Sequence, residues 1–166
     1  MNILLIRHAD ATRAGDAGVL DDESRPLSET GVAQCPPLAR AIRRFGLQPE
    51  IVLSSPLVRA RQTASGLLQN WEGTPPELRI LEELAPGGKR SKLAKVLRGL
   101  SADTVALVGH EPDLGQFAAW LIGSKKARID LAKAGAVWLV SDTVPAKGGA
   151  GLTWMVTPEL CAAVAG

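Results

Sequence analysis

The chain of 166 residues contains two histidines, and each of them lies two residues after the end of a short apolar run. Residues 3–6 (ILLI) precede Arg7 and His8, and residues 105–108 (VALV) precede Gly109 and His110. Such runs are typical of buried β-strands. A cation at the end of a buried strand needs a partner, because an unpaired buried charge is costly. Ligands of open α/β sheets bind beyond the carboxyl ends of the strands, so we expect that partner to be an external anion.

Further charged residues follow two other apolar runs. Arg59 and Arg61 come after the run that ends at Ser54, and Glu82 and Glu83 come after the run 78–81. If the strands are parallel, these residues reach the same edge of the sheet as the histidines. Two residues apart on a helix, the two arginines point to different sides, so we expect Arg61 to be solvated and Arg59 to be the site candidate.

This set of residue types suits phosphoryl transfer. A transferring phosphoryl group spreads negative charge over three oxygens, and the planar arginine fork binds such a group through two hydrogen bonds. A neutral histidine can attack phosphorus and form a covalent intermediate, while a second histidine donates to the oxygens. A carboxylic acid can protonate a poor leaving group.

Each residue also has a structural interpretation that the sequence leaves open. His110 can be a turn histidine satisfied by backbone groups, Arg59 a solvated helix residue, and Glu82 or Glu83 a surface charge. Arg7 and His8 taken alone form a pair of residues that commonly follows a strand. The combination is much more specific than any one of these parts.

The elements that must position these residues alternate along the chain in the manner of an α/β protein. We expect a loop over 10–26, and we expect Pro36 and Pro37 to bend or delay the first helix. The last two strands have hairpin spacing, which adds an antiparallel part to a mostly parallel, mixed sheet with helices on both faces. The strands are predicted at 2–6, 50–54, 78–81, 104–108, 136–141 and 152–156, and the helices at 28–45, 56–70, 89–100 and 112–122, all in a single domain over 1–166.

Composition excludes several classes of function. Hydrophobic residues make up 46% and charged residues 22%, which is ordinary for a soluble domain, and the net charge of +2 indicates neither a nucleic-acid nor a membrane partner. We expect a cytoplasmic protein, because no run approaches the roughly 20 apolar residues of a membrane span and the N-terminus lacks the basic region of a signal peptide.

No metal or cofactor is expected. The two histidines lack HxH or HxxxH spacing, and Cys35 and Cys161 match no metal motif and are expected to be reduced thiols. Neither a G-x-G-x-x-G nor a Walker loop follows the first strand, which disfavours a nucleotide-binding fold.

Four segments together resemble the histidine phosphatase superfamily. The segment 5–10 (LIRHAD) is similar to the Arg-His-Gly signature of that family, with Ala9 in place of the glycine. Segments 25–34 (RPLSETGVAQ), 54–64 (SSPLVRARQTA) and 108–112 (VGHEP) match further family patterns in order. The motifs run from residue 2 to about residue 122, and the terminal hairpin fits more loosely.

The resemblance implies roles for individual residues. His8 matches the nucleophile that becomes phosphohistidine, Arg7 and Arg59 match the phosphate-binding arginines, and His110 matches the second histidine. Glu83 falls where many members place the proton-donor glutamate, a role that short members do not all use. Arg25 is a further candidate for phosphate or substrate contact, or else an arginine that ties down the long loop.

The short connection over 84–104 indicates a member without the helical cap of larger relatives, with a shallow and open pocket, and resembles the SixA-type phosphohistidine phosphatases. The resemblance therefore implies a metal-independent phosphatase that acts on protein phosphohistidine, consistent with signal transduction. The alternatives are a phosphatase of small phosphorylated metabolites and a non-catalytic phosphate-binding module. Mutase activity is disfavoured, because it needs a cap that holds the substrate while it turns over.

Overall fold

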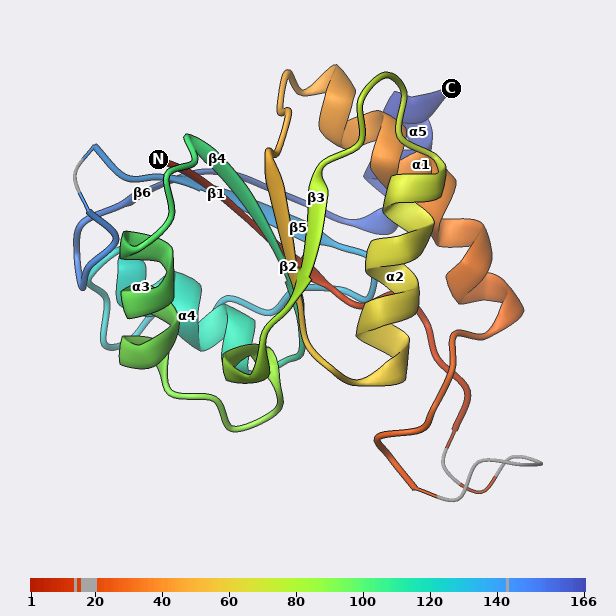
Figure 1. The fold of residues 1–166 in the computed structure, drawn as a ribbon, viewed down its shortest axis with the longest axis horizontal. Coiled ribbons are helices and arrows are strands. Elements are labelled where there is room, and N and C mark those ends of the chain that lie inside the picture. Colours follow the sequence, from red (N-terminus) through yellow and green to blue (C-terminus); the bar gives the residue numbers. More distant parts are fainter. Residues whose placement is uncertain (14, 16–20, 143) are drawn as a thin grey trace.

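The computed structural model describes residues 1–13, 15, 21–142 and 144–166, and these form a six-stranded mixed sheet with helices on both faces (Figure 1). The strands lie in the order β3-β2-β4-β1-β5-β6. Strands β3, β2, β4 and β1 run parallel, and the β5–β6 hairpin joins β1 in antiparallel pairing, as the sequence predicts. The strands are β1 (Asn2–Arg7), β2 (Ile51–Ser54), β3 (Glu77–Ile80), β4 (Thr104–Gly109), β5 (Ala136–Val140) and β6 (Gly151–Val156).

The helices divide between the two faces of the sheet. On one face lie α1 (Glu29–Arg44), α2 (Val58–Gln69) and α5 (Pro158–Ala165), and on the other lie α3 (Arg90–Arg98) and α4 (Asp113–Leu121). Successive residues of β1 alternate between the two cores, with Leu4 and Ile6 on the α1 side and Ile3 and Leu5 on the α4 side. This alternation is the period of a strand covered on both faces, and it explains why the run 3–6 is apolar throughout.

The register of the parallel strands brings three of the predicted site segments together. Arg7 at the end of β1 pairs with Gly109 at the end of β4, and Ser54 at the end of β2 pairs with Val108. The residues that follow these strands therefore leave the sheet at one edge. The prediction that the arginines and histidines converge there is confirmed at the level of the backbone.

Several predicted elements differ from the observed ones. Helix α1 starts at Glu29, capped by the Ser28 side chain, so Pro36 and Pro37 do not delay it. Two backbone donors are missing at these prolines, and the carbonyls four residues earlier belong to exposed residues that water can reach. The sequence analysis did not assign α5, although Thr157 and Pro158 are a usual start for a helix.

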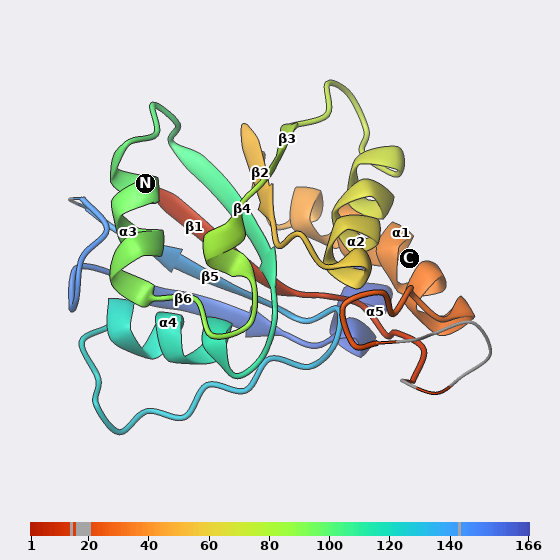
Figure 2. The ribbon, with the colours of Figure 1, turned by 60° about the horizontal axis from the view of Figure 1, so that its bottom comes forward.

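Only a short 3₁₀ turn, η1 (Glu82–Leu84), and the helix α3 lie between β3 and β4 (Figure 2). The fold thus matches the expectation of a connection without a cap. The predicted loop 10–26 lies partly outside the described residues, at 14 and 16–20; its two ends are joined by an antiparallel bridge between Ala11 and Leu27. Within the described part of the chain, no helix has the length and apolar character needed to cross a membrane.

Candidate active site

His8 directly follows β1 and is held in one orientation by its neighbour. Its side chain is 6% exposed, and its Nδ1 lies 2.7 Å from the Ala9 carbonyl oxygen. A carbonyl oxygen accepts only, so Nδ1 carries the proton and donates it in this bond. The Nε2 atom then holds the lone pair, and the Arg59 Nε–H group donates to it at 3.2 Å.

The surroundings of His8 keep its imidazole neutral. Burial lowers the pKa of His8 to about 4, and the positive charges of Arg59 and Arg7 act in the same direction. The hydrogen bond with Ala9 opposes this effect without outweighing it. At neutral pH His8 therefore presents an unprotonated nitrogen, which is the form that a nucleophile needs.

His110 lies beside His8 and is almost fully buried. The two ring centroids are 5.1 Å apart, and the His110 Nε2 atom is 2.8 Å from Ser55 Oγ. Among the described residues the hydrogen bonds of Ser55 Oγ are to the Leu57 backbone N–H, from which it accepts, and to His110 Nε2, which is therefore the acceptor for the hydroxyl proton. This arrangement puts the His110 proton on Nδ1. Burial, followed by the neighbouring His8, lowers the pKa of His110 to about 3, so this ring is neutral as well.

Arg7 and His110 each carry a buried donor nitrogen that has no hydrogen-bond partner within the described part of the chain. Arg7 donates through Nη1 to the Leu131 carbonyl at 2.8 Å, which fixes the guanidinium, but its Nε is unpaired. His110 Nδ1 is unpaired in the same way. Buried donors are almost always satisfied in native proteins, so two such nitrogens around His8 mark a place prepared for an acceptor-rich ligand.

Arg59 enters the site from the first turn of α2, where it is 5% exposed. The Thr63 hydroxyl one turn later donates to the Arg59 carbonyl at 2.7 Å and accepts from the Ala9 N–H at 3.0 Å. This hydroxyl thereby ties the helix that carries Arg59 to the segment that carries His8. Arg61 is exposed, as predicted from its position two residues further along the helix.

Asp22 occupies the outer edge of the Arg59 guanidinium, and the sequence analysis did not identify it. Arg59 Nη1 donates to the Asp22 carbonyl at 2.6 Å, and Nη2 donates to its carboxylate at 3.0 Å. Arg25 donates to the other carboxylate oxygen at 2.7 Å and, through Nε, to the Thr12 carbonyl at 2.6 Å. The hydrogen bond from Arg25 and the charge of Arg59 lower the pKa of Asp22. Arg25 thus ties the loop down and shares an anionic partner with Arg59.

Asp10, two residues after His8, anchors this part of the chain to α1. Its carboxylate accepts from Ser28 Oγ and from Lys133 Nζ, both at 2.6 Å, and its N–H donates to Gln34 at 2.9 Å. A Cβ atom at Gly31 would overlap the Asp10 carbonyl, so only glycine allows this close approach. The motif segment 25–34 therefore contributes residues that position His8 and do not reach it.

Glu83 lies in the 3₁₀ turn and lines a small cavity of about 10 Å³ together with His110. It is half-buried, whereas Glu82 is exposed. The two neighbouring carboxyl groups therefore differ in exposure, although the backbone has already left the extended conformation of β3. A 3₁₀ turn also separates successive side chains, here by about a third of a turn.

Cys35 and Cys161 are free and buried, and burial raises the pKa of each thiol to about 11. Nothing in their position connects them with the site. Among the described residues, no group of three or more histidines, cysteines or carboxylates could hold a metal ion.

A parallel sheet edge with two neutral histidines and two held arginines is the kind of site that transfers a phosphoryl group. Residues 3–98 match the family model of the histidine phosphatase superfamily (branch 1). This chain belongs to that superfamily, and the protein is a phosphatase.

Two relatives span most of the chain. An uncharacterized protein of Picosynechococcus sp. is 36% identical over 145 residues, which cover 85% of this chain and 86% of that protein. The phosphohistidine phosphatase SixA of Escherichia coli is 27% identical over 161 residues, which cover 95% and 94% of the two chains.

Solved structures show the same fold. SixA in complex with tungstate matches with a TM-score of 0.84 at 23% identity, over 96% of this chain and 99% of that one. A putative alpha-ribazole-5'-P phosphatase of Escherichia coli matches with a TM-score of 0.72 at 18% identity, over 95% and 98%. The histidine phosphatase architecture predicted from the motifs is thus confirmed, while the substrate is left open by neighbours of different specificity.

Proposed function

We propose that this phosphatase removes the phosphoryl group from phosphohistidine side chains of proteins, through a covalent phosphohistidine intermediate on His8. One observation supports the proposed mechanism: the neutral His8 ring, with its lone pair on Nε2, lies beside His110 at 5.1 Å between ring centroids, and Arg7 Nε and His110 Nδ1 are buried and unpaired among the described residues. A phosphoryl group bound there would be attacked at phosphorus by the Nε2 lone pair, and the fixed donors would hydrogen-bond to its oxygens.

The reaction proceeds in two steps. His8 Nε2 attacks phosphorus, the bond between phosphorus and the substrate nitrogen breaks, and the leaving imidazole keeps that electron pair and takes up a proton. Water then attacks the phosphorus on His8, the bond from phosphorus to Nε2 breaks, and inorganic phosphate leaves. In both steps Arg7, Arg59 and His110 stabilise the negative charge on the equatorial oxygens.

Arg59 has to exchange partners when the substrate arrives. Its Nε–H now donates to the His8 lone pair, and its Nη2 donates to the Asp22 carboxylate. The incoming phosphoryl group uses that lone pair and supplies new acceptor oxygens to Nε and Nη2. Arg59 thus donates to His8 Nε2 before the substrate binds, and to the oxygens of the phosphoryl group once the substrate is in place.

The choice of protein phosphohistidine rests on two points. The connection between β3 and β4 contains η1 and α3 and no cap, which leaves room for a side chain presented by another protein. Similarity to the phosphohistidine phosphatase SixA extends over almost the whole chain.

A phosphatase of small phosphorylated metabolites is the second candidate. Glu83 favours it, because this half-buried carboxyl group lines the same small cavity as His110. A carboxylic acid beside the leaving group matters most for an alkoxide, which is a poor leaving group.

Two measurements test the proposal. Quenching a turnover reaction in alkali should trap phosphate on His8 of the unaltered protein and not on His8→Ala, which should lose nearly all turnover.

The value of kcat/KM should be highest for a phosphohistidine-bearing protein, compared with sugar phosphates, a phosphoserine peptide and an aryl phosphate. Near-normal turnover by His8→Ala would reject the mechanism, and a much higher kcat/KM for a sugar phosphate would favour the second candidate. A chelator should leave activity unchanged.

A further inference from the structure

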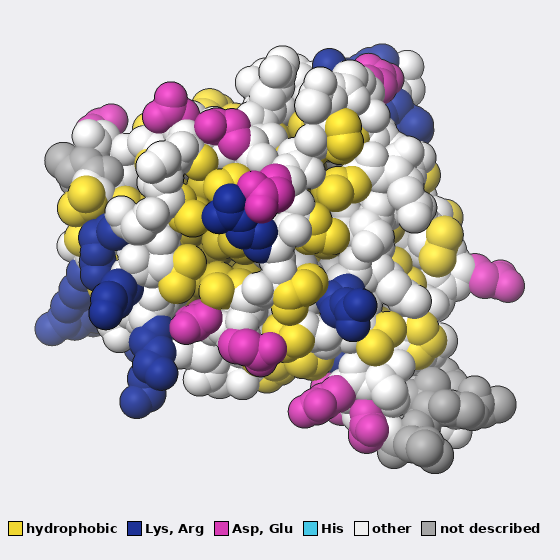
Figure 3. Space-filling view, viewed as in Figure 1, with side chains coloured by type: hydrophobic (Ala, Val, Ile, Leu, Met, Phe, Trp, Pro, Cys, Tyr) yellow, Lys and Arg dark blue, Asp and Glu magenta, His cyan; other side chains and the backbone are white. Residues whose placement is uncertain are grey.

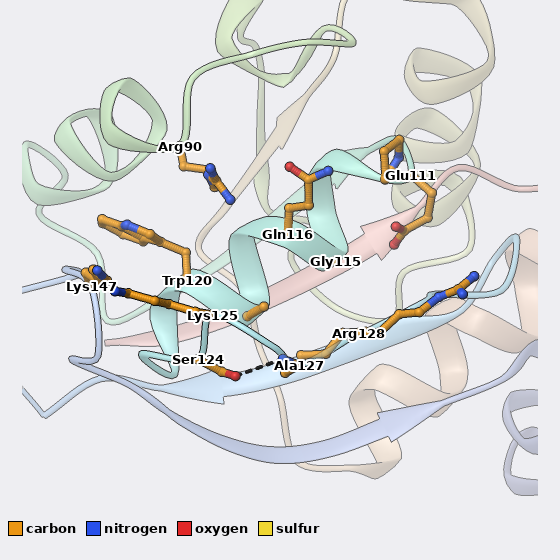
Figure 4. Close-up of a pocket in the computed structure, with 13 residues that line it drawn as sticks. Arg90, Glu111, Gly115, Gln116, Trp120, Ser124, Lys125, Ala127, Arg128 and Lys147 are labelled. Atoms are coloured by element: carbon orange, nitrogen blue, oxygen red, sulfur yellow. Dashed lines mark hydrogen bonds between the residues drawn. The ribbon is translucent and has the colours of Figure 1, made fainter.

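A cavity of about 480 Å³ opens beside α4 (Figure 4), and neither His8 nor His110 is among the residues that line it. Its walls come from α4, the loop that follows it, the start of α3 and the loop before β6. The residues that matter here are Arg90, Glu111, Trp120, Lys125, Ile129 and Lys147. Its volume falls in the range of typical ligand sites, roughly 300–1,000 Å³.

The cavity lies on the most basic part of the molecule. Residues 89–98, residues 124–128 and Lys147, which we call the basic face, hold nine of the 19 lysines and arginines, and neither range contains an acidic residue. Figure 3 shows Lys and Arg side chains gathered over α3, at the left of the view. Since the whole chain carries a net charge of only +2, this concentration leaves an uneven surface that attracts anions.

Three of the cations that line the cavity are available to a ligand. None of the ion pairs within the described part of the chain involves Arg90, Lys125 or Lys147, and all three are exposed. Arg128 differs, because it pairs with Asp130 at 2.6 Å and its side chain extends away from the other cations in Figure 4.

Hydrogen bonds join the segments that carry these cations. Arg98 donates to the Pro145 carbonyl at 2.9 Å, and the Gly148 N–H donates to the Trp120 carbonyl at 3.1 Å. The Ala127 N–H donates to Ser124 Oγ at 2.8 Å. The cations are therefore exposed side chains on backbone segments that hydrogen bonds join.

The lining is not only basic. Trp120 is half-buried and stacks on Phe117 with ring centroids 5.9 Å apart, and Ile129 contributes a partly buried apolar side chain. Glu111 adds one carboxylate to this lining, so the three free cations outnumber it. Such cations next to an aromatic and an aliphatic wall suit a chain that carries carboxylates and an occasional apolar side chain. This combination favours an acidic polypeptide over a bare inorganic anion.

The cavity is connected to the catalytic residues through two shared elements. Arg90 lines both this cavity and the small one that reaches His110. Glu111 follows His110 in the chain, and its Oε1 accepts from the Leu131 N–H at 3.2 Å, while the Leu131 carbonyl accepts from Arg7. A segment bound in the cavity would therefore contact Glu111, the chain neighbour of His110, and Arg90, which also lines the small cavity at His110.

We propose that this cavity binds an acidic segment of the phosphorylated protein substrate and holds it while the phosphoryl group is at His8. The proposal rests on the proposed function and names the recognition element of its substrate. A small phosphate ester at His8 would make no contact with Lys125 or Lys147, so the cavity should separate protein substrates from small ones.

Direct binding is the first test and does not depend on catalysis. The probe is a fluorescein-labelled, unphosphorylated peptide of Asp, Glu and Leu, measured by anisotropy at about 0.01 M salt, where screening is weak. The variant Lys125→Glu/Lys147→Glu should bind it at least about tenfold more weakly than the unaltered protein. The control Lys126→Glu/Arg40→Glu makes the same charge change at exposed positions outside the cavity lining, and should lose less than about threefold.

Turnover is the second test. Two synthetic phosphohistidine peptides are compared, one with an acidic flank and one with a neutral flank. The unaltered protein should prefer the acidic peptide at low salt by about tenfold in kcat/KM, and both the cavity variant and about 0.5 M salt should remove that preference. Hydrolysis of an aryl phosphate should be unchanged in all variants.

The outcomes separate the two proposals. Equal binding of the labelled peptide by the cavity variant and the control variant would overturn the acidic-segment site, even if both phosphohistidine peptides are hydrolysed. Binding that depends on Lys125 and Lys147, without hydrolysis of either phosphohistidine peptide, would reject the proposed function and keep the site. A single-stranded DNA of equal charge that binds the cavity more tightly than the peptide would overturn the assignment to a protein segment.

Discussion

Arg7 and Arg59 differ from Arg90, Lys125 and Lys147 in how firmly the fold holds them. The first two are fixed by backbone carbonyls of Leu131 and Asp22 and lie beside two buried histidines. The other three are exposed side chains with no ion pair among the described residues.

The two groups are suited to different anions. A held guanidinium loses little freedom when it binds and can match the geometry of a phosphoryl group, which favours a defined transition state. Exposed cations act through a screened field, which favours a loosely defined acidic partner and depends on salt. We propose that the same residue types serve catalysis at one place and attraction of a substrate segment at the other.

The largest effect is expected when an arginine that the fold holds in place is replaced by lysine. Arg59→Lys keeps the charge but removes the fork that faces His8 and the phosphoryl group, so kcat/KM for an aryl phosphate should fall by about 10²–10³-fold. Arg61→Lys, two residues further on the exposed side of α2, is the matched control and should change little. Similar losses in both variants would mean that α2 is sensitive to any change, and that Arg59 has no special role.

Lowering the pH should destabilise the folded protein through its buried histidines, whereas the exposed cations should make no contribution to this loss. The pKa of His8 is lowered from 6.5 to about 4, so the unfolded chain binds more protons than the folded one between these values. The free energy of unfolding should therefore fall as the pH is lowered from about 6.5 to about 4, by about 3 kcal/mol on account of His8.

Urea unfolding at both ends of this pH window measures the effect. His8→Gln should reduce the loss of stability in acid, and Lys147→Gln should not. A loss of the same size in His8→Gln as in the unaltered protein would assign the acid sensitivity to other groups.

Glu83 tests whether a carboxyl group at the rim of the site takes part in the chemistry. Glu83→Gln should slow hydrolysis of alkyl phosphates by about 10²-fold, because an alkoxide leaving group needs a proton, and should have little effect on an aryl phosphate or a phosphohistidine. Glu82→Gln is the control, since Glu82 is exposed. Equal losses on every substrate would indicate a structural role for Glu83, and no loss on any substrate would make it a solvated charge.

The smallest effect is expected at Asp22. A phosphoryl group that binds Arg59 has to replace the Asp22 carboxylate as the acceptor for Arg59 Nη2. Its side chain is 59% exposed, so its hold on Arg59 is weakened by solvent. Asp22→Asn should lower the inhibition constant of vanadate by about three- to tenfold, because it removes a competing negative charge. Asp21→Asn is the neighbouring control. Weaker vanadate inhibition by Asp22→Asn would show that Asp22 mainly orients Arg59.

Local sequence patterns were enough to place the groups that meet at the sheet edge. The run 3–6 and the run 105–108 have the composition of strands covered on both faces, and parallel strands deliver their ends to one edge. The motif segments then gave the family. The missed helix α5 had a local signal in Thr157 and Pro158, and the expected delay of α1 by Pro36 and Pro37 neglected the Ser28 cap, so both are errors in the use of local rules.

The sequence by itself therefore determined the six strands, the helices α1 to α4 and the residues that meet at the sheet edge. Only the tertiary structure decided which nitrogen of His8 is free, that Asp22 lies on Arg59, and that Arg90, Lys125 and Lys147 share one cavity. The physical reason is the separation along the sequence of the residues that interact. Hydrophobic periodicity, caps and strand ends are written in neighbouring residues, whereas burial, proton position and the meeting of distant side chains arise only when the chain packs.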